Sequence, residues 1–165
     1  CAAKQGKDKT KRDAARIARA ARVAHRKAIV KAKPLSWHKA KAQASFNRFI
    51  CLRDKLAGHG CITCGTNKPD IQYCAGHYRT RGAAPQLALN EDNVHRQCNK
   101  RCNCELSGNI RAYTPALIER IGQERFDAIE NDNTIKRWTI PELDEVTQKY
   151  RRKARELLKG SHADR

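Results

Sequence analysis

Eight cysteines are the residues of this 165-residue sequence that most directly suggest chemistry, and four of them fall into two close pairs. Cys61 and Cys64 form a CxxC motif, and Cys98 and Cys102 follow after a long insert. Two close pairs that lie far apart in a chain are typical of one tetrahedral Zn²⁺ held by four thiolates. Because four thiolates leave no open position on the metal, the spacing predicts a structural site. Any catalysis must then come from the insert and the segment that follows it.

The choice between Cys102 and Cys104 depends on where the helix after the insert begins. If it begins at Cys98, residues four apart share a face, so Cys98 and Cys102 point together. Cys104 is then rotated away by about 240°, and we expect it to be a buried apolar side chain or an idle thiol. If the helix begins later, Cys104 could replace Cys102. We expect Cys51 and Cys74 to be packed thiols rather than ligands.

The insert holds the residue types that could hydrolyse a phosphodiester. Its sequence includes "CAGHYRTRGAAPQLALNEDNVHRQC", with His77 and His95 as its histidines, Asn93 before the second of them, and Asn103 directly after Cys102. A neutral imidazole can activate a water molecule at physiological pH. Amide oxygens and imidazoles can both bind a divalent ion, and such an ion can stabilise the charge that develops on a phosphate.

The charge of the chain points to a polyanionic partner. Lys and Arg number 35 against 17 Asp and Glu, for a net charge of +18, and nucleic acid is the default partner of such a field. The alternative is a merely soluble, highly charged surface. Residues 1–33 are Ala-rich and strongly basic, and predict a helical or partly disordered arm. Its arginines, among them Arg12, Arg16 and Arg19, suit phosphate contacts; the alternative is a solubilising tail.

Apolar spacing divides the rest of the chain into a helix, a core, a helical hairpin and a tail. A helix over 34–57 starts near Ser36. The core, 58–112, has short strands and loops, and its alternating stretch 93–97 reads as a strand. The hairpin, 113–160, is expected to hold two helices. The signals for their starts are Thr114 with Pro115, and the capping box of Thr139 with Glu142. A tail over 161–165 follows. The fold class is therefore α+β and mostly helical, with a small zinc-stapled core flanked by long α-helices.

Two further absences narrow the class of protein. No apolar run reaches the roughly 18 residues of a membrane span, and no secretory signal is visible. A disulfide-stapled secreted protein is therefore disfavoured, and we expect a cytoplasmic protein without a membrane partner. The sequence contains no Met, so we expect the N-terminus to be a fragment boundary, with Cys1 the remnant of an upstream element.

Several motifs resemble known nucleases. "GHY…N…QC…CN" is similar to the HNH, or ββα-metal, nucleases built on a treble-clef zinc scaffold. Over about 34–158, the chain resembles the NinG/Rap family of phage recombination endonucleases. The motifs that carry this resemblance are "CITCGT", "AGHYRTRGAAPQL", "NVHRQC", "LSGN", "LIERIGQE" and "RWTI". It implies a structure-specific endonuclease that cleaves branched DNA, such as Holliday junctions and D-loops, in a bacterial host cell. It also implies that Cys1 ends a lost cysteine-rich finger.

The resemblance assigns roles to residues of the insert. His77 matches the general base, Asn93 the residue that positions the base or its loop, and Asn103 a ligand of a catalytic Mg²⁺ or Mn²⁺. Gly76 departs from the pattern, because many HNH enzymes carry a metal-binding Asp there. The candidates to substitute for it are Asp70, Asp92, His95 and Glu105, of which we expect His95. The arginines that flank the base, Arg79, Arg81 and Arg96, suit phosphate contacts.

Rival interpretations remain open at this point. Because Gly76 stands where many HNH enzymes carry a metal-binding Asp, a zinc-stabilised DNA-binding protein without catalysis is one alternative. An RNA-binding or ribosome-associated zinc protein is another candidate, although the aromatic residues expected for reading single strands are sparse. Symmetric cleavage of a four-way junction needs two active sites, so a homodimer is plausible.

Overall fold

The computed structural model describes residues 2–163, with side chains at 11–30 and 32–161. The chain forms two compact units, Cys1–Trp37 and His38–Arg165. The predicted arm over 1–33 falls in the first unit, and the predicted core falls in the second. The expectation that concerns Cys1 lies outside the described residues.

The first unit is built around one long helix, α1 (Ala2–Lys31). Alanine and arginine both favour helix, and α1 ends shortly before Pro34, which cannot continue one. The apolar side chains Ile17, Val23 and Ile29 are all exposed. Because no described side chain of α1 is buried, this helix has no core of its own.

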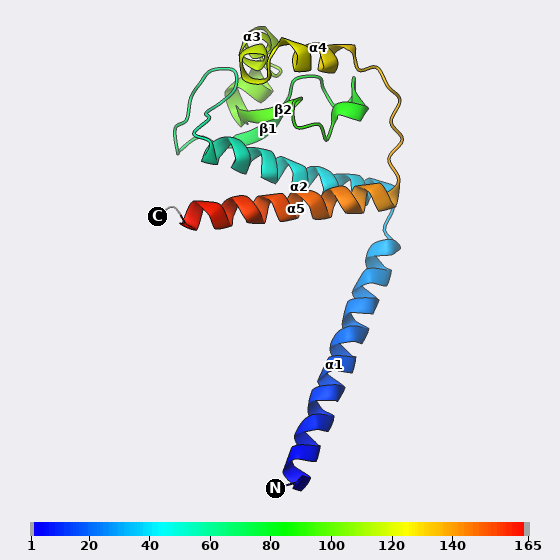
Figure 1. Ribbon diagram of the computed structural model, residues 1–165. Helices are drawn as coiled ribbons and strands as arrows, with labels where there is room; N and C mark the ends of the chain where they lie inside the picture. The colour runs from blue at the N-terminus through cyan, green and yellow to red at the C-terminus, as the bar shows by residue number, and fades with distance from the viewer. Residues whose placement is uncertain (1, 164–165) are drawn as a thin grey trace. The chain divides into compact units, whose positions relative to one another are not determined.

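The second unit is organised around a two-stranded antiparallel ribbon, β1 (Tyr73–His77) and β2 (Val94–Cys98) (Figure 1). His77 lies opposite Val94, and Gly76 lies opposite His95. Residues directly opposite each other share a face, and successive residues alternate between faces. His77 and Val94 therefore occupy one face of the ribbon, and Gly76 and His95 the other. The predicted strand over 93–97 is confirmed, displaced by one residue.

Two helices cover the face that carries Val94. These are α2 (Leu35–Leu56) and α5 (Ile140–Ala163), which lie side by side in Figure 1. Phe46 and Phe49 of α2 contact the ring of Tyr150 on α5, with centroid distances of 4.9 and 5.2 Å. Val94 completes this apolar cluster from the strand side, so aromatic packing fixes the ribbon on the helix pair.

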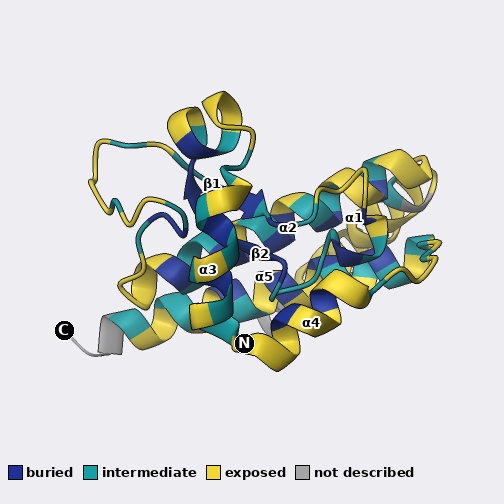
Figure 2. Cartoon of the chain, turned by 90° about the horizontal axis from the view of Figure 1, so that it is seen from above, coloured by how far each residue is buried: buried dark blue, intermediate teal, exposed yellow. Residues whose placement is uncertain are grey.

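The opposite face packs against α3 (Ile110–Ile121) and α4 (Gln123–Asn131). Tyr78, Tyr113, Leu117 and Phe126 form the centre of this second cluster. The Tyr113 hydroxyl is buried and donates a hydrogen bond of 3.0 Å to the carbonyl of Gly76. Helices thus pack on both faces of the ribbon. The whole of β2 is buried, whereas β1 is mostly intermediate in burial (Figure 2).

The helix boundaries of the C-terminal segment correct one expectation and confirm another. The start predicted at Thr114 is wrong, because α3 begins at Ile110 after Asn109, whose φ is +50°, and Pro115 lies inside the helix. The extra turn brings Tyr113 into the core. The backbone then breaks at Gly122, with φ +83°, so three helices follow the core rather than two. The Thr139 capping box is confirmed, since its backbone N–H donates to Glu142 Oε2 at 2.8 Å.

The segment after β2 also differs from the expectation. Cys98 is the last residue of the strand, in an extended conformation, and a π-helical turn, η2 (Asn99–Glu105), follows it. A 3₁₀ turn, η1 (Pro85–Leu87), lies between the strands. The predicted α+β class with mostly helical content is confirmed. Among the described helices, none has an apolar stretch long enough to cross a membrane.

Candidate metal centre and histidine loop

The structure brings together the four cysteines that the spacing singled out. The sulfur atoms of Cys61, Cys64, Cys98 and Cys102 all lie within 4.8 Å of one another. Three of these residues are buried, while Cys64 is exposed. Four converging thiols at this separation can bind one metal ion such as zinc in a tetrahedral shell.

A tight turn presents the first cysteine pair. The Cys61 carbonyl accepts a hydrogen bond from the N–H of Gly65 at 2.8 Å, and the Ile62 N–H donates to the Arg96 carbonyl on β2 at 2.9 Å. Gly65 has φ +72°, a conformation that favours glycine. At Gly60 a Cβ atom would lie 2.4 Å from the Gly65 carbonyl oxygen. The turn therefore depends on two glycines and docks directly on the edge of the ribbon.

The cysteine thiols differ strongly in their proton affinity. Burial raises the pKa of Cys98 to about 12. Burial also acts to raise the pKa of Cys61, but hydrogen bonds from the Thr63 hydroxyl and nearby backbone groups outweigh it and hold that pKa at about 6. One thiolate thus has local hydrogen-bond support. A cation among the four sulfurs would favour the thiolate form of all of them.

The structure separates Cys102 from Cys104 as predicted. Cys102 is buried in the cluster, whereas Cys104 is exposed and its sulfur lies 3.9 Å from Asn99 Oδ1. The expectation that Cys104 could be a buried apolar side chain is wrong, and an idle thiol describes it better. Burial raises the pKa of Cys51 to about 11 and that of Cys74 to about 12, in keeping with packed thiols.

His77 ends β1 at the start of the long loop to β2. Its Nε2 lies 3.1 Å from the carbonyl oxygen of Ala88. A carbonyl only accepts hydrogen bonds, so Nε2 must carry a proton in this contact, and the lone pair of the neutral ring is then on Nδ1. Burial holds the pKa of His77 below its usual 6.5, and the charge of Arg81 acts in the same direction. The ring is therefore neutral at physiological pH, as a general base must be.

Gln43 of α2 supports the same contact. Its Nε2 donates to the Ala88 carbonyl at 3.2 Å and to Asn47 Oδ1 at 2.8 Å. It also lies 3.5 Å from His77 Nε2, but both nitrogens carry protons, so this is a neighbour contact rather than a hydrogen bond. The carbonyl of Ala88 is thus shared by an amide from α2 and the imidazole of His77.

Asn93 joins the two ends of the histidine loop, defined here as residues 78–93. Its Oδ1 accepts from the Arg79 N–H at 2.8 Å, and its Nδ2 donates to the carbonyls of Arg79 and Leu87 at 3.0 and 3.1 Å. The side chain is fully buried. Three hydrogen bonds to backbone groups make Asn93 the clamp of the loop that carries the contact to His77.

His95 occupies a different environment from His77. It is 2% exposed, and its Nδ1 lies 3.4 Å from the Tyr113 hydroxyl. Burial and the nearby charge of Arg53 lower the pKa of His95 to about 3, so the ring is neutral. The ribbon places the two histidines on opposite faces. The contact with Tyr113 engages Nδ1 of His95, and the ligation of a catalytic ion by His95 stays a prediction.

Gly76 is glycine for a local reason. A Cβ atom there would lie 2.3 Å from Oε1 of Gln97 and 2.9 Å from its Cβ. The Gln97 amide nitrogen donates to the Gly108 carbonyl at 2.7 Å, which orients the oxygen toward Gly76. That oxygen is buried and accepts no hydrogen bond from the described residues. Gln97 therefore fills the space that a side chain at position 76 would need.

Asn103 lies in η2 and is partly buried, with its Nδ2 3.9 Å from the sulfur of Cys104. The other candidates for the missing carboxylate were Asp70, Asp92 and Glu105. Asp92 is engaged with Arg125, whose Nε donates to Asp92 Oδ2 at 2.8 Å. Among the described residues, the cysteine cluster is the only group of three or more His, Cys, Asp or Glu side chains placed to hold a metal ion.

Two of the three arginines near the histidine loop are used internally. Arg79 donates to the carbonyls of Ile129, Glu130 and Asp132 and so caps the end of α4. Arg96 is 6% exposed, and its guanidinium stacks 3.5 Å from the ring centroid of Tyr73. A guanidinium that is engaged within the protein is poorly placed to contact phosphate. Of the three arginines, Arg81 is exposed and remains the candidate for such a contact. On α1, Arg12, Arg16 and Arg19 are exposed, with Arg16 3.5 Å from Asp13.

One buried carboxylate escaped the sequence analysis. Asp54 of α2 is 2% exposed and accepts hydrogen bonds from Arg53 Nε at 2.8 Å and from the backbone N–H of Arg96 at 2.6 Å. Burial opposes its charge, but the bonds from Arg53 and Arg96 outweigh burial and lower its pKa. It thereby caps the open edge of β2. The only signal in the sequence was an acidic residue on the apolar face of a predicted helix.

Comparison with known proteins identifies close relatives. The family model described as "Bacteriophage Lambda NinG protein" matches residues 1–160. Protein ninG of Escherichia phage lambda is 46% identical over 125 residues, which cover 76% of this chain and 59% of that protein. Protein ninG of Salmonella phage P22 is 44% identical over 125 residues, covering 76% of this chain and 60% of its own length. The chain thus spans about three-fifths of the length of these relatives. No solved structure matches it.

Proposed function

This chain belongs to the NinG family, and we propose that its second unit is the HNH-like core of a metal-dependent, structure-specific DNA endonuclease. The observation that carries the proposal is the state of His77. A partly buried hydrogen bond from Nε2 to the Ala88 carbonyl leaves Nδ1 as the basic nitrogen, and the pKa of the ring is lowered. The substrate that we propose is branched DNA, and the phage origin of the relatives places the proposed reaction in the cytoplasm of a bacterial host.

In the proposed reaction His77 acts as the general base. Its Nδ1 takes a proton from a water molecule, and the resulting hydroxide attacks the scissile phosphorus in line with the 3′ oxygen, which leaves. The products are a 5′-phosphate and a 3′-hydroxyl. Asn93 holds the loop in register, and Gln43 fixes the Ala88 carbonyl, so the ring keeps one orientation without help from substrate.

The cysteine cluster and a catalytic ion would have separate roles. Four thiolates suit a closed, structural zinc site that pins the turn at Cys61 to the end of β2. A Mg²⁺ or Mn²⁺ beside Asn103 would supply positive charge to the phosphate and the leaving oxygen. Asn103 offers one neutral amide oxygen, which fits an ion held mainly by substrate phosphate and water, as Mg²⁺ often is.

One observation favours a second candidate, a zinc-stabilised DNA-binding protein without catalysis. Gly76 replaces the metal-binding Asp of many HNH enzymes, and Gln97 fills the space. Few protein ligands are therefore available for a catalytic ion. This candidate predicts unchanged DNA binding with no cleavage under any divalent ion.

The deciding experiment compares cleavage and binding on one preparation. Zinc-loaded protein is incubated with a labelled four-way junction and a matched linear duplex, in Mg²⁺, Mn²⁺ or EDTA. We expect junction cleavage that needs the added ion. His77→Ala should abolish cleavage, and His59→Ala, at an exposed histidine, should leave it intact. Both variants should bind the junction as tightly as the unmodified chain. Binding without cleavage under every ion would contradict the nuclease and support the DNA-binding protein.

A further inference from the structure

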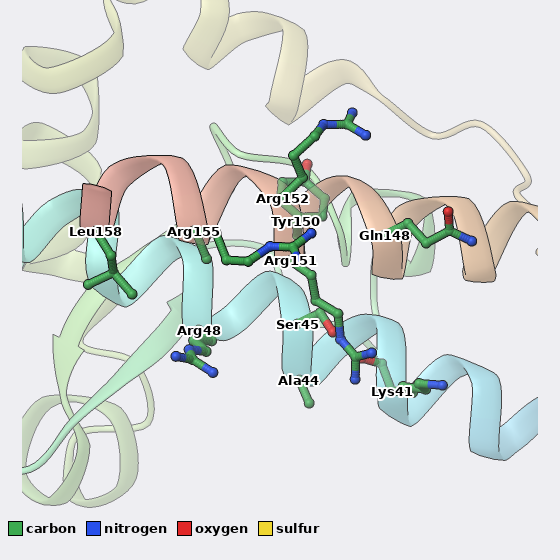
Figure 3. Close-up of a pocket in the computed structure, with 11 residues that line it drawn as sticks. Lys41, Ala44, Ser45, Arg48, Gln148, Tyr150, Arg151, Arg152, Arg155 and Leu158 are labelled. Atoms are coloured by element: carbon green, nitrogen blue, oxygen red, sulfur yellow. The ribbon is translucent and has the colours of Figure 1, made fainter. Parts of the chain in front are cut away.

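A basic groove of 730 Å³ runs between α2 and α5, within the second unit (Figure 3). It lies apart from the cysteine cluster and the histidine loop, none of whose residues line it. Its cationic lining comes from both helices: Lys41 and Arg48 on α2, and Arg151, Arg152 and Arg155 on α5. No aspartate or glutamate lines it.

Three of the four arginines that line the groove differ from the other cations around it. In the part of the chain whose side chains the structure describes, no carboxylate pairs with Arg48, Arg151 or Arg155. Outside the groove α5 does use ion pairs, since Lys153 Nζ lies 2.6 Å from Glu91 Oε1. Arg152, which points away from α2 in Figure 3, lies 4.0 Å from Glu156. Among the residues whose side chains the structure describes, no carboxylate therefore offsets the charge of Arg48, Arg151 and Arg155, where the two helices face each other.

Such an arrangement favours an external anion. Arg151 and Arg155 are one helical turn apart, where like charges repel and lower helix stability. The planar forks of guanidinium groups match phosphate oxygens in two-point contacts. Lys41 and Arg48 are spaced about 10 Å along α2 by the helical rise. Cations spread over this length on two banks suit a row of phosphates better than a single small anion.

We propose that this groove binds the sugar–phosphate backbone of duplex DNA. The proposal rests on the proposed function and deepens it, because it gives the second unit a DNA contact of its own, separate from the arginines of α1. The two features share one helix. Gln43 of α2 holds the Ala88 carbonyl that orients His77, while Arg48 of the same helix lines the groove.

The test is a comparison of two variants that each lose two positive charges. R151Q/R155Q removes charge from the groove, and glutamine keeps a good helix propensity. R137Q/K159Q is the matched control, at exposed residues outside the groove. Binding of labelled four-way junction and linear duplex is followed by fluorescence anisotropy between 50 and 200 mM salt, roughly the range in which phosphate contacts are resolved. We expect the groove variant to bind about tenfold more weakly, with a salt slope shallower by about 2, while the control changes little.

Three outcomes would overturn the proposal. One is an affinity and salt slope equal to those of the unmodified chain. Another is an equal loss of affinity in the control variant, which would show that only the net charge of the chain matters. The third is equal competition by polyglutamate, which would assign the groove to an acidic polypeptide. Arg48→Gln, on the α2 bank, must weaken binding independently, so the result does not depend on α5 tolerating two substitutions.

The binding assay is independent of the nuclease. If the unmodified chain fails to cleave under every ion but loses affinity through R151Q/R155Q, the nuclease proposal fails and the groove stands. If His77→Ala abolishes cleavage while R151Q/R155Q binds normally, the groove fails and the nuclease stands.

Discussion

The two ends of the β1–β2 ribbon are held by different kinds of interaction. At one end Tyr73 lies opposite Cys98, whose sulfur belongs to the cysteine cluster. At the other end His77 lies opposite Val94, next to the Asn93 clamp. The five paired positions separate these ends by about 14 Å.

The difference lies in what each end needs from outside the chain. The cysteine end can bind a metal ion. Such binding would need deprotonated thiols, and ligation of this kind is coupled to folding. The histidine end is held by neutral hydrogen bonds to backbone groups, each weaker and none dependent on metal. The cysteine end therefore suits a stable structural role, and the histidine end suits holding the His77 ring in one orientation.

The largest effect is expected at the cysteine end. Cys61→Ser should abolish stoichiometric zinc binding and the cooperative unfolding transition, because a structural zinc contributes on the order of 10 kcal/mol. Zinc content and thermal unfolding by circular dichroism measure this. Cys104→Ser is the control and should stay within about 0.5 kcal/mol of the unmodified chain. Loss of zinc in Cys104→Ser would show that the ligand set is wrong.

The next effect is expected at the histidine end. Asn93→Ala removes the three hydrogen bonds of a fully buried side chain. The N–H and the carbonyl of Arg79 lose these partners, whereas the Leu87 carbonyl keeps the N–H of Asn90 at 3.1 Å. The expected cost is about 3 kcal/mol. Zinc should still bind. Urea unfolding with zinc present measures the change, and Asn133→Ala, at an exposed partner of Arg79, should cost far less. Zinc loss in Asn93→Ala would mean that the two ends do not fail separately.

A smaller effect is expected in the middle of the ribbon. Gly76→Asp introduces the residue that the proposed HNH-like function would favour at this position, but its Cβ would lie 2.3 Å from Gln97 Oε1. We expect a loss of about 2 kcal/mol from overpacking and no gain in cleavage. Adding Gln97→Ala should recover part of that stability. Higher ion-dependent activity in Gly76→Asp alone would show that the space is more adaptable than the structure indicates.

The smallest effect concerns the proton on His77. Its pKa is lowered, first by burial and then by Arg81, so the basic form persists below the usual 6.5 and is lost only as the pH falls through the lowered pKa. The single-turnover cleavage rate should therefore be flat above neutral pH and fall on the acid side. Arg81→Gln removes a repelling charge, raises the pKa and moves this acid limb slightly toward higher pH. A shift in the opposite direction would exclude His77 as the titrating base.

The cysteine cluster was predictable because ligand spacing is local information. Two closely spaced cysteine pairs indicate a metal site whatever structure the chain between them adopts. The prediction that Cys102 rather than Cys104 joins the cluster agrees with the structure, although Cys98 proved to be in a strand. The error in the secondary structure of Cys98 did not affect the predicted ligand set, because the turn after Cys98 still brings Cys102 to the other three sulfur atoms.

Tertiary contacts decided what the sequence left undetermined. Burial of Tyr113 draws α3 one turn earlier than the Thr114 signal indicates. Arg79 donates hydrogen bonds to the C-terminal end of α4, and Arg96 stacks on Tyr73, so neither guanidinium is free for the predicted phosphate contact. The helix that carries Tyr150 packs on α2 instead of pairing with its neighbour in sequence. None of these outcomes has a periodic signature, because each depends on residues far apart along the chain.

The clamp and the cluster close two rings of chain, one inside the other. Cys64 and Cys98 span 34 residues, and Arg79 and Asn93 span 14 within them. The entropy lost on closing a loop grows with the logarithm of its length, so each closure shortens the path that the other must close, and the two support each other equally. The inner ring is closed by hydrogen bonds of about 1 kcal/mol each, whereas metal ligation at the outer ring would be worth on the order of 10 kcal/mol. With an ion bound, the inner ring should therefore open first, and the backbone around His77 could move while the fold stays intact.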